Sequence, residues 1–155
     1  MAVYQLYKEQ KLPASIDDVW GFISSPKNLQ RITPSYMGFN ISSKDLPEKI
    51  FTGLMISYKV SPLFNIKMNW ITEITQVKEM ESFFDEQHRG PYKIWKHEHY
   101  ISPIEGGVLM KDRVTYQLPY GILGEIAHSL LVRKKIVEIF DFRENALTEI
   151  FGDFN

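Results

Sequence analysis

Two histidines near the middle of the chain offer the clearest potential for chemistry. They occur in segment 93–101, KIWKHEHYI, where alternating side chains of a β-strand point to opposite faces. One face would carry Trp95, His97, His99 and Ile101. Histidine can donate, accept or transfer a proton near neutral pH, and it can also bind a metal. The segment therefore predicts a polar, titratable group on an otherwise apolar face.

The two neighbouring segments supply matching faces. The preceding segment places Phe83, Asp85, Gln87 and Arg89 together, and the following one places Met110, Asp112, Val114 and Tyr116 together. If all three faces point inward, an apolar wall carries a polar belt made of Asp85, Gln87, His97, His99, Asp112 and Tyr116. Trp70 and Trp95 are expected in the core or in this wall.

Three roles are open to the histidines. They can be hydrogen-bonded to a neighbouring Asp beside a cavity, which is the reading we favour. They can act as a general acid or base if a substrate lies next to them. They can bind zinc together with an Asp, but a closed zinc site needs further ligands and the chain has no Cys. We therefore predict no bound metal.

Arg143 lies within an apolar stripe near the C-terminus. The stripe follows helical spacing and contains Val132, Ile136, Ile139, Phe140, Leu147, Ile150 and Phe151. A guanidinium on a buried stripe needs a partner, because an isolated buried charge is costly. Asp85, Asp112 or a ligand anion are the candidates. Alternatively, the side chain reaches solvent at the edge of the sheet.

The surrounding sequence predicts the elements that position these residues. A first strand is expected over 3–12, and short helices over 16–23, capped by Ser15, and 27–32, after Pro26. Two helices, with a join near 131–133, are expected over about 121–130 and 132–151. The remaining strands are expected over 37–42, 54–60, 66–77, 81–89, 92–102 and 108–118.

This order of elements predicts an α+β fold. Short connections favour an antiparallel sheet, and a sheet of this length twists and curls. The helix over 132–151 is the available partner for its concave face, with Phe140 and Leu147 pointing inward. Space left between sheet and helix would form a cavity. No linker or repeat divides the chain, so we expect one domain over 1–155.

Composition excludes several classes of protein. The 155 residues are 44% hydrophobic and carry a net charge of −1, which gives no global positive field for nucleic acid. The absence of Cys excludes disulfides and thiolate catalysis. We see neither a signal peptide nor a membrane span, so we expect a cytoplasmic protein without stable membrane insertion. We also expect a monomer or a homodimer. Aromatic residues reach 14%, enough to line an apolar cavity as well as a core.

Several motifs resemble a bacterial branch of the START-like (SRPBCC) superfamily, which includes polyketide cyclases, coenzyme Q-binding proteins and the birch pollen allergen group. The motifs are Phe84-Asp85-Glu86-Gln87, Gly90-Pro91-Tyr92, Trp95, His97-Glu98-His99, Gly106-Gly107, Asp112-Arg113-Val114-Thr115-Tyr116 and Leu118-Pro119-Tyr120-Gly121. The resemblance covers nearly the whole chain. It implies a helix-grip fold with a deep apolar cavity for a hydrophobic small molecule. No catalytic set of the family maps onto these positions.

The sequence thus favours a non-enzymatic protein that binds or carries a lipid-like or polycyclic molecule, without a cofactor. We expect the ligand to contact Trp70, Asp85, Gln87, Trp95, His97, His99, Asp112, Tyr116, Phe140 and Arg143. The alternative is a cyclase or dehydratase acting on a polyketide-like substrate. In that case His97 or His99 would move the proton, Asp112 would orient it, and Arg143 would hold an enolate or carboxylate.

Overall fold

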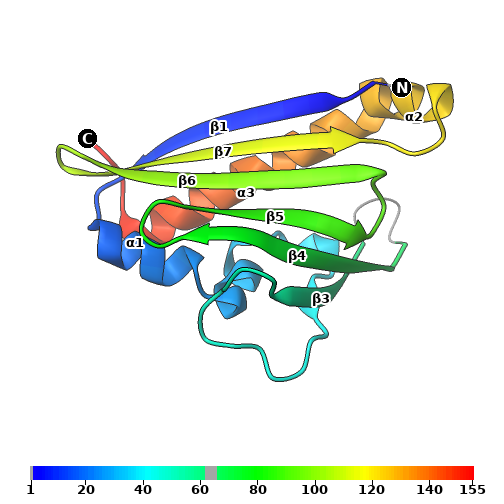
Figure 1. Cartoon of the computed structure of the whole chain (residues 1–155). Coiled ribbons are helices and arrows are strands. Elements are labelled where there is room, and N and C mark those ends of the chain that lie inside the picture. The colour runs from blue at the N-terminus through cyan, green and yellow to red at the C-terminus, as the bar shows by residue number, and fades with distance from the viewer. Residues whose placement is uncertain (1, 62–65) are drawn as a thin grey trace.

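The strands form one curved antiparallel sheet in the computed structural model, which describes residues 2–61 and 66–155 (Figure 1). The order across the sheet is β1-β7-β6-β5-β4-β3-β2. The strands are β1 (Tyr4–Leu12), β2 (Asn40–Ile41), β3 (Met55–Val60), β4 (Met68–Lys78), β5 (Ser82–Arg89), β6 (Ile94–Ile104) and β7 (Gly107–Gln117). The predicted α+β class and antiparallel sheet are confirmed.

The first strand pairs with the last, so the sheet is not a simple meander. β1 runs along β7 from Tyr4 opposite Tyr116 to Leu12 opposite Val108. The approach is close at the β6–β7 turn, where a Cβ on Gly107 would collide with the backbone oxygen of Leu12. This pairing places β7 inside the sheet, between β1 and β6.

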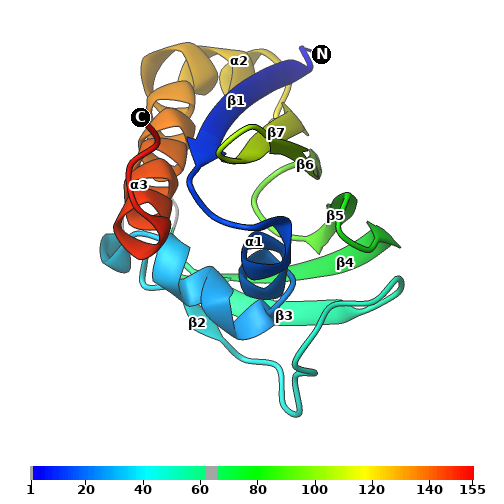
Figure 2. The same ribbon diagram turned by 90° about the vertical axis from the view of Figure 1, so that its left-hand side faces the viewer.

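Short helices follow β1 and cover one end of the sheet (Figure 2). Helix α1 (Ile16–Ile23) begins as predicted, with the Ser15 side chain accepting a hydrogen bond from the backbone N–H of Asp18 at 3.1 Å. The predicted second helix is a 3₁₀ helix, η1 (Pro26–Ile32), and a further 3₁₀ turn, η2, covers Ser35–Met37. These turns bring apolar residues over the concave face.

The C-terminal helical region corrects one prediction. We expected two helices with a break near 131–133. The structure instead has α2 (Ile122–Ala127), a π-helical segment η3 (His128–Val132) and α3 (Arg133–Phe151), which follow one another directly. A π-turn contains one more residue than an α-turn, and each α-helical residue advances by about 100°, so the apolar stripe changes direction without a break.

The two parts of this region have different surroundings. α3 lies in the concavity of the sheet and buries Ile136, Phe140 and Leu147, which confirms the predicted inward side (Figure 2). In contrast, a second set of apolar residues at helical spacing, which precedes α3, faces outward. These residues are between 50 and 76% exposed: Ile122, Leu123, Ile126 and Leu130. The buried residue of α2 is Gly124, and its backbone lies so close to the Pro119 carbonyl that a Cβ at this position would collide with the oxygen.

The remaining differences are confined to element ends. The predicted strand over 37–42 is shortened to Asn40–Ile41, because Met37 ends the 3₁₀ turn η2 and Gly38 follows with φ +60°. The other strands begin and end within two residues of their predicted bounds. In the part of the chain that the structure describes, no helix combines the length and apolarity needed to cross a membrane.

Candidate functional site

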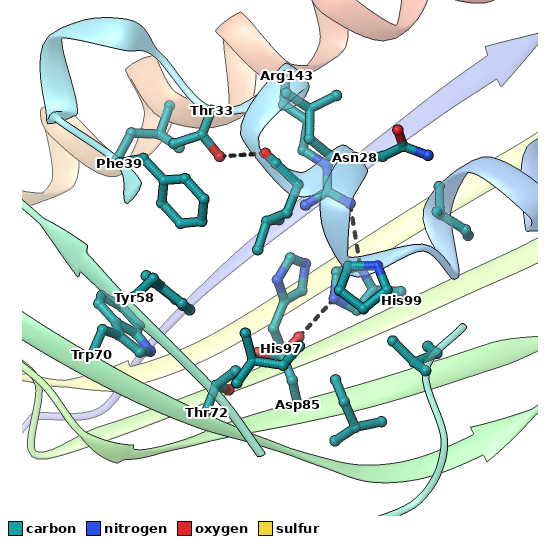
Figure 3. Close-up of a pocket in the computed structure, with 18 of the residues that line it drawn as sticks. Asn28, Thr33, Phe39, Tyr58, Trp70, Thr72, Asp85, His97, His99 and Arg143 are labelled. Atoms are coloured by element: carbon teal, nitrogen blue, oxygen red, sulfur yellow. Dashed lines mark hydrogen bonds and ion pairs between the residues drawn. The ribbon is translucent and has the colours of Figure 1, made fainter. Parts of the chain in front are cut away.

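A cavity of about 170 Å³ lies between the concave face of the sheet, α3 and η1. Its walls come from elements far apart in the sequence (Figure 3). The sheet contributes Ile56, Tyr58, Val60, Trp70, Thr72, Ile74, Phe83, Asp85, Trp95, His97 and His99. The helical side contributes Phe22, Ile23, Pro26, Asn28, Leu29, Ile32, Met37, Ile139, Phe140 and Arg143, and connecting segments contribute Ser25, Thr33, Phe39, Ile50 and Tyr92.

One end of the cavity is an aromatic wall. The indole of Trp70 lies nearly parallel to the Tyr58 ring, with 5.8 Å between centroids, and meets Trp95 edge-on at 5.4 Å. Tyr92 packs against both tryptophans. Burial raises the pKa of the Tyr58 phenol well above its usual value, so that phenol stays neutral. The wall therefore offers an apolar surface without charge.

The deeper end of the cavity holds a cluster of charged and titratable groups. His97 Nε2 lies 2.8 Å from Asp112 Oδ1, and His99 Nε2 lies 2.8 Å from Asp85 Oδ2. His99 Nδ1 is 3.1 Å from Asp112 Oδ1. Arg143, from α3, brings its Nη2 to 3.6 Å from the same Asp112 oxygen. We call these five residues the His–Asp–Arg cluster.

Opposing effects on the pKa values set the charges within this cluster. Burial opposes ionisation of both carboxyl groups, but the neighbouring histidines and Arg143 outweigh its effect on the two pKa values. For Asp85 the hydrogen bond from His99 lowers the pKa, and for Asp112 the charge of Arg143 and the histidine bonds lower the pKa well below its usual value. Burial also disfavours charge on His99, yet its hydrogen bonds to Asp112 and Asp85 raise its pKa.

His97 behaves differently from His99 although the two rings are stacked, with centroids 3.6 Å apart. Burial, reinforced by the charge on His99, lowers the pKa of His97 to about 4. With His99 protonated between the two carboxylates that its nitrogens contact, the cluster holds two carboxylates, one imidazolium and one guanidinium. These charges cancel, which is the condition under which ionised groups are tolerated in a protein interior.

The protonation of His99 also assigns the hydrogens around Asp112. A doubly protonated ring donates Nε2–H to Asp85 and Nδ1–H to Asp112. Arg143 Nη2, 3.3 Å from His99 Nδ1, is then a second donor directed at the same carboxylate rather than a partner of the ring. The face of His99 is covered by Phe83, with centroids 4.0 Å apart.

The cluster contains atoms of the types that bind metals. Ligand atoms of Asp85, His97 and His99 all lie within 4.8 Å of one another. However, both Nε2 atoms are already directed at carboxylates, and Arg143 supplies positive charge beside them. A divalent cation would add two charges to a cluster that is already neutral. This donor set fits a metal poorly, and the absence of a bound metal stays a prediction.

The structure brings seven of the ten predicted ligand residues to the cavity wall: Trp70, Asp85, Trp95, His97, His99, Phe140 and Arg143. The other three lie elsewhere. Gln87 donates to the Tyr92 carbonyl at 2.6 Å and accepts from the Tyr92 N–H, so it braces the β5–β6 connection. Asp112 lies behind the histidines.

Tyr116 is the third residue that the cavity lining omits. Its hydroxyl lies 2.8 Å from Nε2 of His128, in the π-helical segment, and both residues are buried. The His128 ring is stacked on Tyr4, with centroids 3.5 Å apart. Burial lowers the pKa of His128, and the charge of Arg133 lowers it further, so this histidine is neutral.

Sequence reasoning missed two groups of cavity residues. Ile56, Tyr58 and Thr72 lie on β3 and β4, where the same alternation that identified His97 and His99 would have selected them. The second group is on η1 and includes Leu29 and Ile32. No local pattern marks those residues, because they reach the cavity only when η1 folds over the sheet.

No protein-family model and no curated protein matches the chain. Solved structures do. The KanY protein (ms6282) has a TM-score of 0.72 at 12% identity, over 99% of this chain and 100% of that one. CV1439 from Chromobacterium violaceum has a TM-score of 0.70 at 10% identity, over 97% and 98%. The structure titled Ara h 8.0201 has a TM-score of 0.59 at 14% identity, over 96% and 99%.

These similarities extend over almost the entire chain, so they concern the complete arrangement of sheet and helix rather than one motif. At such low identity they establish the fold alone. The chain has the helix-grip fold that the resemblance implied.

Proposed function

We propose that the protein binds a hydrophobic small molecule in the cavity between the sheet and α3. The observation that carries this proposal is the composition of the wall, in which aliphatic and aromatic side chains surround a charge-neutral polar cluster. The charges of the cluster offset one another, although the buried Nε–H of Arg143 has no acceptor among the described residues. Apolar contact is therefore the main interaction left for a guest. The fold supports the same proposal, since a sheet curved around one helix encloses such a space.

The volume limits the guest in this conformation. An engineered protein cavity of about 150 Å³ holds benzene, so a cavity of about 170 Å³ suits a molecule of one or two fused rings. A larger polycyclic or lipid-like guest would require η1 or α3 to move outward.

An acid–base enzyme is the second candidate, and the contact between His97 and Asp112 on the cavity side of β6 favours it. Two features weigh against it. A pKa of about 4 makes His97 a weak base at neutral pH, and both nitrogens of His99 are directed at carboxylates. Substituting His97 with Ala separates the candidates: a carrier would lose a few-fold in affinity, and an enzyme roughly 10²- to 10⁴-fold in rate.

The cellular setting is also part of the proposal. A net charge of −1 supports the expectation that the protein has no nucleic-acid partner. We propose that it acts in the cytoplasm as a monomer or homodimer. Sedimentation of the purified protein tests the oligomeric state, and fractionation of the cells that make it tests the location.

A cavity-filling variant tests the binding proposal. Ile139 lines the cavity from α3, whereas Phe142 on the same helix is 40% exposed and outside the lining. We expect the fluorescent hydrocarbon 2-isopropylnaphthalene to bind the unmodified protein with a 1:1 stoichiometry. Binding should be lost in Ile139→Trp and kept in Phe142→Trp. Equal binding by both variants, or no binding by the unmodified protein, would count against the cavity as a binding site.

A further inference from the structure

A row of apolar side chains lies on the outer surface of α2 and η3, away from the cavity. Its members are between 50 and 76% exposed, and we call them the outward stripe: Ile122, Leu123, Ile126 and Leu130. Single exposed apolar residues are ordinary on a protein surface. A row of large ones at helical spacing forms a continuous patch, and such patches mark interaction sites.

The inner side of the same helical region keeps the stripe outward. Gly124 packs against the Pro119 carbonyl with no room for a side chain. His128 and Val132 are the buried residues of η3, and the His128 ring is stacked on Tyr4. The helix therefore cannot turn the outward stripe towards the core without losing these contacts.

The connection between β7 and α2 adds an exposed aromatic residue beside the stripe, at the end of the sheet next to the N-terminus (Figure 1). Tyr120 is 82% exposed and has a φ of +71°, a strained conformation for a bulky residue. Strain of this kind is concentrated at functional sites. The amphipathic ring of tyrosine suits the boundary between an apolar phase and water.

Basic residues follow the stripe directly. Arg133, Lys134 and Lys135 are consecutive, and Glu125 is the one acidic residue in the sequence from 119 to 135. Lys135 forms an ion pair with Glu138 at 3.6 Å, whereas the other two cations are exposed at the start of α3. In a chain with a net charge of −1, this run gives one end of the helical region a local positive charge.

We infer that the outward stripe and the exposed cations Arg133 and Lys134 dock the protein reversibly on a membrane that contains anionic lipids. The apolar side chains enter the headgroup region, and the two cations meet the lipid phosphates. A second copy of the chain fits less well, because a stable protein–protein interface takes about 20–30 residues from each side, many more than this patch supplies. The inference goes beyond the proposed binding of a small molecule and does not depend on it.

Co-sedimentation with vesicles tests the inference. One set of vesicles contains phosphatidylcholine alone, and the other contains equal parts of phosphatidylcholine and phosphatidylglycerol. Leu123→Gln combined with Leu130→Gln removes apolar surface at two exposed positions, where glutamine is a comparable helix former. The matched control is Phe51→Gln combined with Met55→Gln, because these side chains are 53 and 42% exposed and lie outside the stripe.

A second pair of variants removes charge instead of apolar surface. Arg133→Gln combined with Lys134→Gln removes the exposed cations beside the stripe. Lys44→Gln combined with Lys49→Gln removes the same charge from exposed positions in the connection between β2 and β3.

We expect the unmodified protein to bind the anionic vesicles more tightly than the neutral ones. The leucine variant should lose roughly 10-fold in affinity for the anionic vesicles, and the cation variant roughly 5-fold for each charge removed. Both controls should bind as the unmodified protein does.

Three results would overturn the inference. The first is no binding to the anionic vesicles, or equal binding to both kinds of vesicle. The second is an equal loss in the variants and their controls. The third is a leucine variant that keeps its vesicle binding but loses self-association in sedimentation velocity, which would show that a second copy covers the stripe.

Discussion

Two points on β7 anchor the C-terminal helical region, and they do so by different means. The carboxylate of Asp112 forms ion pairs with His99 and Arg143, so α3 is held to the sheet through ionised groups. Four residues further along the same inward face, Tyr116 contacts His128 of the π-helical segment. There the ring of Tyr4 covers the histidine, and no carboxylate contacts it among the residues that the structure describes.

The contrast shows how partners decide the charge of a buried histidine. Burial lowers the pKa of both His99 and His128, but only His99 has carboxylates to reverse the effect. The first anchor is therefore electrostatic and lies beside the cavity, whereas the second is neutral and lies outside it. Removal of a partner should have unequal consequences at the two sites.

The largest effect is expected for Arg143→Met. The change keeps the aliphatic part of the side chain but leaves Asp112 and Asp85 with one positive partner instead of two. Breaking a buried ion pair from one side typically costs about 3–5 kcal/mol. Urea denaturation would measure this loss in the free energy of unfolding.

Arg113→Met is the matched control. Arg113 lies on β7 next to Asp112, and on the solvent side of the sheet it forms an ion pair with Glu98 at 2.8 Å. A surface pair contributes less than about 1 kcal/mol. If both variants lose the same free energy, Arg143 reaches solvent and the cluster is not a charge-balanced unit. If Arg143→Met instead weakens ligand binding and leaves the free protein stable, the arginine anchors the ligand.

A smaller effect is expected at the neutral anchor. Tyr116→Phe removes one hydrogen bond and leaves Nε2 of His128 buried without this partner, which should cost about 1–2 kcal/mol. Tyr100→Phe, which removes a part-buried hydroxyl contact to Glu98, should cost less. A loss at Tyr116 as large as that at Arg143 would contradict the distinction between the two anchors.

The histidine charges can be read directly by NMR titration of the imidazole nitrogens. We expect His99 to lose its proton above pH 6.5, His128 to gain one only below pH 6.5, and His97 to do so near pH 4. The stabilising contribution of His99 is then present below pH 6.5 and is lost as the pH rises through its folded-state pKa.

For His128 and His97 the direction is opposite. Their contributions are present above pH 6.5 and are lost as the pH falls through their lowered pKa values. Titration of His99 below that of His128 would show that the carboxylates do not hold its proton.

The outline of this fold could be predicted from the sequence because successive side chains of a strand point to opposite faces of the sheet. Period-2 patterning placed His97 and His99 on one face, and helical spacing identified the inward side of α3 around Phe140. The order of elements and the motifs together indicated the helix-grip architecture. These signals come from local spacing, and the side chains keep the predicted directions in the folded protein.

Contacts made only in three dimensions could not be read in this way. Tyr116 has the same alternation as Asp112, but the π-helical segment places His128 against it. Gln87 shares a face with Asp85, yet the β5–β6 turn engages its side chain. The outward stripe containing Ile122 and Leu123 follows the same spacing as a buried stripe, so burial could not be inferred from spacing alone.

Isoleucine methyl groups allow the most direct test of the binding site. Ile56, Ile74 and Ile139 line the cavity, whereas Ile122 and Ile126 are exposed on α2. With methyl-labelled protein and 2-isopropylnaphthalene, we expect intermolecular NOEs from the probe to Ile56, Ile74 and Ile139 and none to the two isoleucines on α2. NOEs confined to Ile122 and Ile126 would show that the probe binds the outer surface, and would contradict a ligand site between the sheet and α3.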